Sequence, residues 1–150
     1  MRLRTRPATI GDAVSVLSRM SDVTKAEMQA LGRGAFDTLV AAKTYIRDGD
    51  AVCAHTRQPL FVLGLVPHAM VPNLKLTWFI ATQEWFDLGA KGVLLGRKIM
   101  RDLAARHPGA IIQSVSLSPH PDTARWFALH GFEEVDRGGN YAVFEFCRKR

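Results

Sequence analysis

The chain has 150 residues, of which 47% are hydrophobic, 9% aromatic and 23% charged. This length and composition fit one globular domain over residues 1–150 and exclude the collagen-like, coiled-coil and intrinsically disordered classes. Twenty lysines and arginines against fourteen acidic residues give a net charge of +6 at pH 7. Such a charge indicates an acidic partner (nucleic acid, a phosphorylated cofactor or an anionic membrane), or else it only keeps a small domain soluble.

The cysteines and the N-terminus narrow the class further. Cys53 and Cys147 form no CxxC motif and no Cys/His cluster at metal spacing, so the sequence predicts neither a disulfide nor a metal site. The charged N-terminus has no apolar segment behind it, as a signal peptide would, and no run reaches the ~20 apolar residues of a membrane span. We therefore expect a protein made in the cytoplasm, with no membrane span.

The first third of the chain predicts a strand and then short helices. Residues 2–9 alternate between charged and small or apolar side chains, which is typical of an edge or first strand. Asp12 is the predicted N-cap of the following helix. Thr24 and Glu27 have the spacing of a capping box and predict a second helix that ends at Gly32.

A further helix and three strands follow. Apolar residues in helical spacing over 36–46 end at the turn signal of residues 48–50. Three β-rich runs then predict an antiparallel meander, at residues 51–56, 60–66 and 74–80. Gly64 lies inside the second run, where a glycine indicates a bulge or a close backbone approach.

The longest predicted helix extends from about Ala90 to His107. Leu95, Ile99 and Leu103 lie along one face of it, and its charges are mostly basic: Lys91, Arg97, Lys98, Arg101 and Arg106. The basic side is either the solvated face of an amphipathic helix or a phosphate-binding face.

The last third predicts a strand, a short helix and a hairpin. Residues 110–117 alternate as a strand does, and residues 123–130 form a helix that ends at Gly131, which suits a left-handed position. Residues 137–140 read as the turn between the last two strands. The whole order predicts an α+β fold in which helices flank a mixed, mostly antiparallel sheet.

This order resembles the GNAT superfamily of acyl-CoA-dependent N-acyltransferases. The segment RPATIGDA (residues 6–13) looks like the opening strand and helix of that superfamily, and ARWFALHGFEEV (124–135) looks like its late helix and following strand. Gly131 and Phe132 are the most specific match. The resemblance implies a GNAT-like fold and an ancestral acetyl-CoA site.

A narrower resemblance covers about two dozen residues. TWFIATQEWFDL (77–88), followed by a Lys-rich helix containing KIMRDL, is similar to the internal virion protein A family of short-tailed phages (podoviruses). That resemblance implies a bacteriophage virion protein with a degenerate GNAT layout and an accessory role in virion assembly. Its partners would be other virion proteins, or further copies of itself as a homo-oligomer, and its location the host cytoplasm and the virion.

The GNAT resemblance also places a cofactor site. A helix N-terminus favours a pyrophosphate, because its free amides and its dipole are positive. The superfamily pattern is Gln or Arg, two residues, Gly, one residue, then Gly or Ala, and it falls on Gly89 to Leu94. Only Gly92 matches. Gly89, Lys91 and Gly92 are therefore the candidate residues for binding acetyl-CoA, although the same glycines suit an ordinary junction between loop and helix.

The proton-transfer residues of the superfamily are missing. Many members place a Tyr four residues before the Gly of Gly-Phe, where it protonates the leaving thiolate, and Phe127 at that position has no hydroxyl. His120 replaces a common Asn. No Glu lies on the strand at 74–80, which leaves Glu84, His55 and His68 as candidate bases, so we assign no catalytic residue.

Three functions remain open. The main prediction is a phage-type GNAT-like protein with an eroded catalytic signature that acts structurally in virion assembly. The alternative is an acetyl-CoA-dependent N-acetyltransferase. A third possibility is contact with nucleic acid through two basic ends of the chain, Arg2, Arg4 and Arg6 together with Arg148, Lys149 and Arg150.

Overall fold

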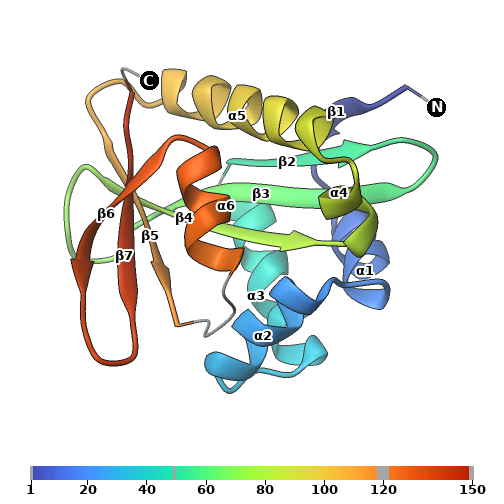
Figure 1. The fold of residues 1–150 in the computed structure, drawn as a ribbon, viewed down its shortest axis with the longest axis horizontal. Helices are drawn as coiled ribbons and strands as arrows, with labels where there is room; N and C mark the ends of the chain where they lie inside the picture. The colour runs from blue at the N-terminus through green and yellow to red at the C-terminus, as the bar shows by residue number, and fades with distance from the viewer. Residues whose placement is uncertain (1, 49, 118–121, 149–150) are drawn as a thin grey trace.

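The computed structural model describes residues 2–48, 50–117 and 122–148. Its strands are β1 (Arg4–Pro7), β2 (Asp50–His55), β3 (Pro59–Pro67), β4 (Leu74–Ala81), β5 (Ile111–Ser116), β6 (Phe132–Arg137) and β7 (Ala142–Phe146). Its helices are α1 (Ile10–Ser18), α2 (Asp22–Ala30), α3 (Ala35–Asp48), α4 (Gln83–Asp87), α5 (Ala90–Ala105) and α6 (Asp122–Leu129). The strands form one sheet in the order β1-β2-β3-β4-β5-β7-β6 (Figure 1). Among the described strands only β4 and β5 pair in parallel, so the predicted α+β class with a mostly antiparallel sheet is confirmed.

Helices cover both faces of this sheet. One apolar core lies between the sheet and the side of α4, α5 and α6, and it includes Phe61, Trp85 and Leu103. A second core lies between the opposite face and α1, α2 and α3. Side chains alternate between the two faces along each strand, so Phe79 packs on the first core and its neighbour Trp78 on the second. The two aromatic residues therefore both serve packing, on opposite faces.

The predicted meander is confirmed, and Gly64 marks a close approach. Gly64 pairs directly with Trp78 across β3 and β4. A Cβ added at Gly64 would lie 2.4 Å from the indole Nε1 of Trp78, so the absence of a side chain makes room for that ring. The register irregularity in this part of the sheet lies instead between Ala54 and His55.

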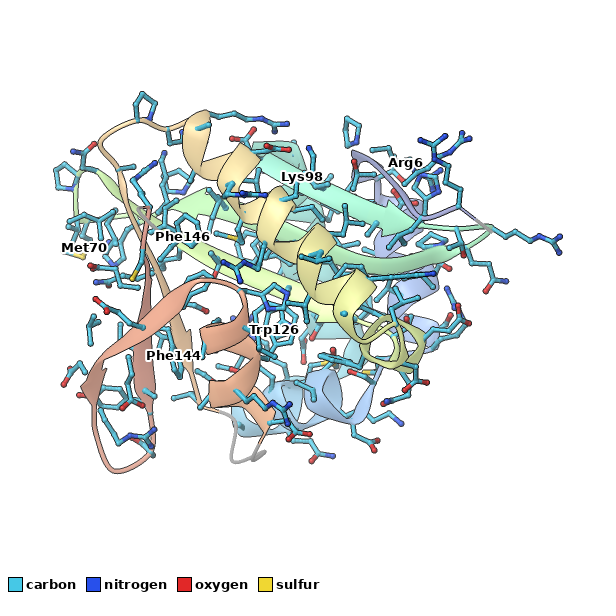
Figure 2. All side chains as sticks on the ribbon, turned by 45° about the horizontal axis from the view of Figure 1, so that its top comes forward. Arg6, Met70, Lys98, Trp126, Phe144 and Phe146 are labelled. Atoms are coloured by element: carbon cyan, nitrogen blue, oxygen red, sulfur yellow. The ribbon has the colours of Figure 1, made fainter. Side chains whose placement is uncertain are left out.

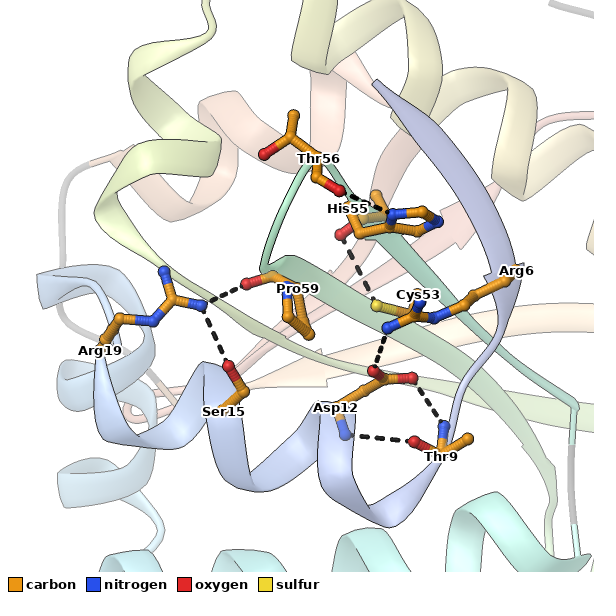
Figure 3. A network of polar contacts seen from close by, with 10 residues as sticks. Arg6, Thr9, Asp12, Ser15, Arg19, Cys53, His55, Thr56 and Pro59 are labelled. Atoms are coloured by element: carbon orange, nitrogen blue, oxygen red, sulfur yellow. Dashed lines mark hydrogen bonds and ion pairs between the residues drawn. The ribbon is translucent and has the colours of Figure 1, made fainter. Parts of the chain in front are cut away.

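The start of α1 differs from the prediction. Thr9, and not Asp12, is the N-cap, and Asp12 closes a capping box from the third helical position. The Asp12 carboxylate also accepts a 2.7 Å hydrogen bond from Arg6, which ties β1 to α1 (Figure 3). Burial opposes ionisation of Asp12, but the hydrogen bonds from Arg6 and Thr9 outweigh it and lower the pKa of this carboxyl. Cys53, beside this pair, is a free core thiol whose pKa burial raises to about 12.

The predicted capping box at Thr24 and Glu27 is wrong. Ser21 caps α2, because its hydroxyl accepts from the Thr24 N–H. Thr24 and Glu27 lie inside the helix and use their side chains for contacts with the sheet. The local spacing was correct for a capping box, but an N-cap three residues earlier takes its place.

The second half of the chain follows the predicted elements closely. Ile99 and Leu103 of α5 are buried against the sheet, and all the basic side chains of the helix are exposed. α6 ends at Leu129, Gly131 just beyond it has φ +91°, and the following Phe132 is buried. No helix in the described ranges is long and apolar enough to cross a membrane.

Helices α5 and α6 meet at His130. The imidazole Nδ1 donates a 2.7 Å hydrogen bond to the Trp126 carbonyl, and a Cβ added at Gly96 would lie 2.3 Å from Nε2. Only 1% of His130 is exposed, and its Nε2 has no hydrogen-bond partner among the described residues. Burial lowers the pKa of His130 to about 4, so the ring is neutral at pH 7.

The contact between Gly64 and Trp78 predicts a large effect of one methyl group. We expect Gly64→Ala to lower the free energy of unfolding by about 1–3 kcal/mol, because the ring must move out of its packed position. Gly139→Ala is the matched control, since nothing lies within 4 Å of a Cβ at that position. Urea titration of both variants checks this, and equal stabilities would contradict it.

Buried His130 predicts a pH-dependent stability. As pH falls below 6.5, the unfolded chain binds a proton that the folded protein refuses until about pH 4. The free energy of unfolding should therefore fall by about 3 kcal/mol between these limits through this group, and no further below them. Urea titrations at several pH values from 4 to 7 measure this fall in the free energy of unfolding. His130→Phe, which cannot titrate, should have a flatter profile, and parallel profiles would refute the assignment.

Candidate functional site

Strands β4 and β5 separate in the middle of the sheet. They pair only where Leu74, Lys75 and Leu76 lie beside Ile111, Ile112 and Gln113. Beyond these residues β4 continues to Ala81 and β5 to Ser116 without further pairing between them. We call the opening between residues 77–81 and 114–116 the β4–β5 wedge.

The backbone N–H and C=O of Phe79 on β4 face this wedge. The backbone N–H of Thr82 donates to the Leu60 carbonyl on β3. Because the direction of the backbone hydrogen bonds alternates along a strand, Ile80 and Trp78 also bond toward β3. Ala81 therefore points the other way, and it bonds to Ser21 and Thr24 of the α2 N-terminus. The N–H and C=O of Phe79 share that direction, and no described residue pairs with them. The wedge thus offers a free strand edge to an extended ligand.

A cavity of about 130 Å³ lies beside the wedge on the side of α2 and α3. Its wall is mostly apolar: Met28, Leu31, Ala41, Ala42, Tyr45, Trp78, Phe79, Ile80, Val115 and Phe127. The polar side chains are Thr24, Glu27, Arg33, Thr38, Thr77 and Ser114. The buried Oγ1 of Thr77 has no hydrogen-bond partner among the described residues.

Glu27 is the one acidic side chain among the described residues that line this cavity. Its carboxylate accepts hydrogen bonds from the Ser116 hydroxyl at 2.9 Å and from the Leu117 N–H at 3.3 Å. These contacts hold the carboxylate at the end of β5. Glu27 is not among the site residues predicted from the sequence, because its capping-box spacing assigns the side chain to a helix cap. The signal that could have corrected this was Ser21, a competing N-cap.

The N-terminus of α5 has the features of an anion site. Gly89 is its N-cap, with φ +59°, and makes no side-chain capping bond. The first intrahelical bond runs from Val93 to Gly89, which leaves the N–H groups of residues 90–92 without an intrahelical acceptor. The Lys91 side chain is exposed beside them, whereas Gly92 is buried against α4. A Cβ at Gly92 would lie 3.1 Å from the Trp85 carbonyl, so helix packing already explains this glycine.

Aromatic rings fill the space on the other side of the wedge. Trp126 stacks on Phe79 with ring centroids 4.3 Å apart and on His130 at 4.1 Å, and it lies between α6 and α5 (Figure 2). Phe127, at the position of the missing Tyr, stacks on Phe144 at 4.3 Å. It is 2% exposed and also lines the cavity. A phenyl ring therefore occupies the place that the resemblance gives to a phenol.

The predicted candidate bases lie away from the cavity. His55 is half-buried on β2, with Nδ1 bonded to the Thr56 carbonyl. His68 accepts bonds from Met70 and Val71 in the loop before β4, and Glu84 is exposed on α4. None of the three lines the cavity, and His120 lies outside the described residues.

The predicted basic ends also have structural uses. The Arg148 guanidinium donates to the carbonyls of Ala104, His107 and Ala110, where it caps the C-terminal end of α5. Arg6 is paired with Asp12. Arg2 and Arg4 line a shallow groove against α5, and Lys149 and Arg150 lie outside the described residues. Of the six basic residues proposed for nucleic acid, two are therefore engaged within the fold.

Comparison with known proteins identifies the architecture. No protein-family model and no curated sequence matches the chain. Among solved structures, the GNAT domain of S. lividans PAT has a TM-score of 0.68 at 17% identity, over 96% of this chain and 89% of that one. A GNAT phosphinothricin acetyltransferase from Sinorhizobium meliloti, in complex with acetyl-CoA, has a TM-score of 0.62 at 14% identity (97% and 88% covered). PaiA N-acetyltransferase from Thermoplasma acidophilum, in complex with coenzyme A, has a TM-score of 0.63 at 13% identity, over 97% of this chain and 99% of that one.

These identities establish the architecture alone. The narrower resemblance to the internal virion protein A family stays a prediction. Nearly the whole chain superimposes on these acetyltransferases, and the order of helices and strands along the chain agrees with the order predicted from the residues. The chain has the GNAT fold.

Proposed function

We propose that the protein is an acetyl-CoA-dependent N-acetyltransferase. The observation that carries the proposal is the β4–β5 wedge, with the free backbone N–H and C=O of Phe79, beside an apolar cavity and in the same fold as a helix N-terminus that suits an anion. The N-terminus of α5 suits an anionic group, the wedge suits an extended arm that carries amide groups, and the cavity suits a small acceptor. The acetyltransferases of similar fold support it, because two of those structures hold acetyl-CoA or coenzyme A.

The residues present fit the phosphate end of the cofactor. The free N–H groups of residues 90–92 and the positive end of the α5 dipole would hold the pyrophosphate, with Lys91 as its cation. Gly89, with φ +59°, shapes this start of the helix, and Gly92 lets α4 pack closely against it. Bound acetyl-CoA supplies an activated acetyl thioester. The remaining chemistry belongs to the chain.

We assign two groups to the transfer step. The Phe79 N–H, facing the wedge, polarises the thioester carbonyl as a preoriented donor. Glu27, at the rim of the cavity, orients the acceptor amine and takes the proton that the amine loses on attack. Phe127 cannot donate a proton, so the leaving thiolate takes its proton from water. This last step makes the enzyme slower than a relative with a phenol at that place.

The anion site predicts a charge-dependent affinity. Lys91→Ala should weaken acetyl-CoA binding roughly fivefold, because one exposed cation beside a phosphate contributes about 1 kcal/mol. Lys98→Ala, two turns further along the same helix and paired with Asp102, is the matched control and should bind like the parent chain. Isothermal titration at two salt concentrations measures both. Absence of saturable binding by the parent chain would refute the proposed function.

The missing phenol predicts a gain of activity. Phe127→Tyr places a hydroxyl at the wall of the cavity and should raise the acetylation rate at pH 7 by at least roughly tenfold, since positioned general acids contribute more than this in enzymes. Phe144→Tyr adds the same hydroxyl to the ring stacked on it and serves as control. Release of free thiol is the assay. Equal rates in both variants would show that thiolate protonation does not limit the reaction.

A further inference from the structure

We infer that the acceptor is an amino acid whose small aromatic or branched apolar side chain enters the cavity between α2, α3 and β4, while its carboxylate pairs with Arg33. The inference rests on the proposed function, which requires that the acceptor carry an amine. The cavity determines the other two groups, through the chemistry of its wall and through an arginine that has no partner among the described residues.

The wall of the cavity selects an apolar side chain. Met28, Ala42 and Phe127 contribute only hydrocarbon or thioether surface. The rings of Tyr45 and Trp78, with centroids 5.5 Å apart, form an aromatic wall. A space of about 130 Å³ is close to the roughly 150 Å³ of an apolar cavity that binds benzene in another protein. A charged or strongly hydrated side chain would lose its water there without replacement.

The charges of the lining select an anion. Among the described residues that line the cavity, two carry a charge, Glu27 and Arg33. Glu27 accepts from Ser116 and Leu117 at the end of β5 and has a further contact, so no ligand group is needed to balance its charge. The exposed guanidinium of Arg33 makes no hydrogen bond or ion pair with a described residue. Asp37, the next acidic residue, accepts instead from a backbone N–H at the start of α3. The charge left for a ligand is therefore positive.

The position of Arg33 supports this assignment. Helix α2 ends in a Schellman motif, in which Gly32, with φ +67°, donates to the Gln29 carbonyl at 3.0 Å. The N–H of Arg33 completes the motif by donating to the Met28 carbonyl at 2.9 Å. The residue at this place is frequently apolar and packs on the helix, but here it is an arginine next to Met28 of the cavity wall. Its guanidinium also caps no described carbonyl, whereas Arg148 caps those at the end of α5. Neither the motif nor the helix end therefore accounts for the charge.

The test is an amide NMR titration of the whole chain without acetyl-CoA, with three probes that all carry the amine. L-phenylalanine has both selected groups, L-phenylalaninamide lacks the carboxylate, and L-serine lacks the apolar side chain. We expect L-phenylalanine to shift the amides of Met28, Ala41 and Trp78. It should bind at least about fivefold more tightly than either other probe, which is the change expected from one exposed ion pair. Equal or tighter binding of either other probe, or no shifts at these amides, would overturn the inference.

Matched variants separate the two contributions. Arg33→Gln should bring L-phenylalanine and L-phenylalaninamide to within about twofold of each other, because it removes the charge and keeps a polar side chain. Arg57→Gln, in the turn between β2 and β3, removes another exposed arginine and should leave the preference unchanged. Ala41→Leu adds bulk to the cavity wall and should weaken L-phenylalanine at least about fivefold, whereas Ala105→Leu, on the exposed side of α5, should not.

The amide spectrum of each variant shows whether it is folded. An unchanged preference in Arg33→Gln, or unchanged binding of L-phenylalanine by Ala41→Leu, contradicts the inference. So does loss of the preference in Arg57→Gln, because this arginine does not line the cavity.

The outcome is distinguishable from failure of the proposed function. Because the probes are titrated without cofactor, amino-acid binding at the cavity and acetyl-CoA binding at α5 are measured separately. Acetyl-CoA binding without amino-acid binding would refute the inference and leave an acetyltransferase for a different acceptor. Selective amino-acid binding without acetyl-CoA binding would refute the proposed function and leave an amino-acid site on a GNAT fold.

Discussion

The contacts of α2 with both β4 and β5 determine the shape of the site. At one end of the helix, Thr24 pairs with the peptide of Ala81, which is the last residue of β4. One turn later, Glu27 binds the end of β5 through Ser116 and Leu117. Two strands that no longer pair with each other are thus each bonded to the same helix. The separation of the strands is stable because the polar groups at their ends are satisfied by α2.

This arrangement explains why an opening persists in the middle of a well-packed sheet. Residues 61–65 of β3 pair with strands on both sides, and the free backbone N–H and C=O of Phe79 lie where β4 has lost its neighbour on one side. On the α5 and α6 side the ring of Trp126 stacks on Phe79, and on the α2 side the cavity remains. The wedge therefore has aromatic rings on one side and the cavity on the other.

Periodicity predicted most of the fold, because the face that a residue presents follows from its local spacing. The meander, the long helix and the left-handed Gly131 all follow from such local rules. The site was less predictable. Glu27 has the spacing of a cap, and only the tertiary position of β5 shows that it reaches Ser116. Likewise, the separation of β4 from β5 depends on contacts between residues more than fifty positions apart, such as Thr24 with Ala81. No pattern within a short window contains that information.

The two edges of the sheet differ in electrical sign. β1 presents Arg4 on a four-residue strand that ends at Pro7, and β6 presents Glu133, Glu134 and Asp136 around an irregularity in its register. Like edges of two copies repel each other. Between unlike edges, the proline and the irregular register interrupt the hydrogen-bond ladder that attraction would otherwise favour. The chain thus carries safeguards against strand-by-strand aggregation at both margins of the sheet, whereas the free backbone groups of Phe79 lie in its middle.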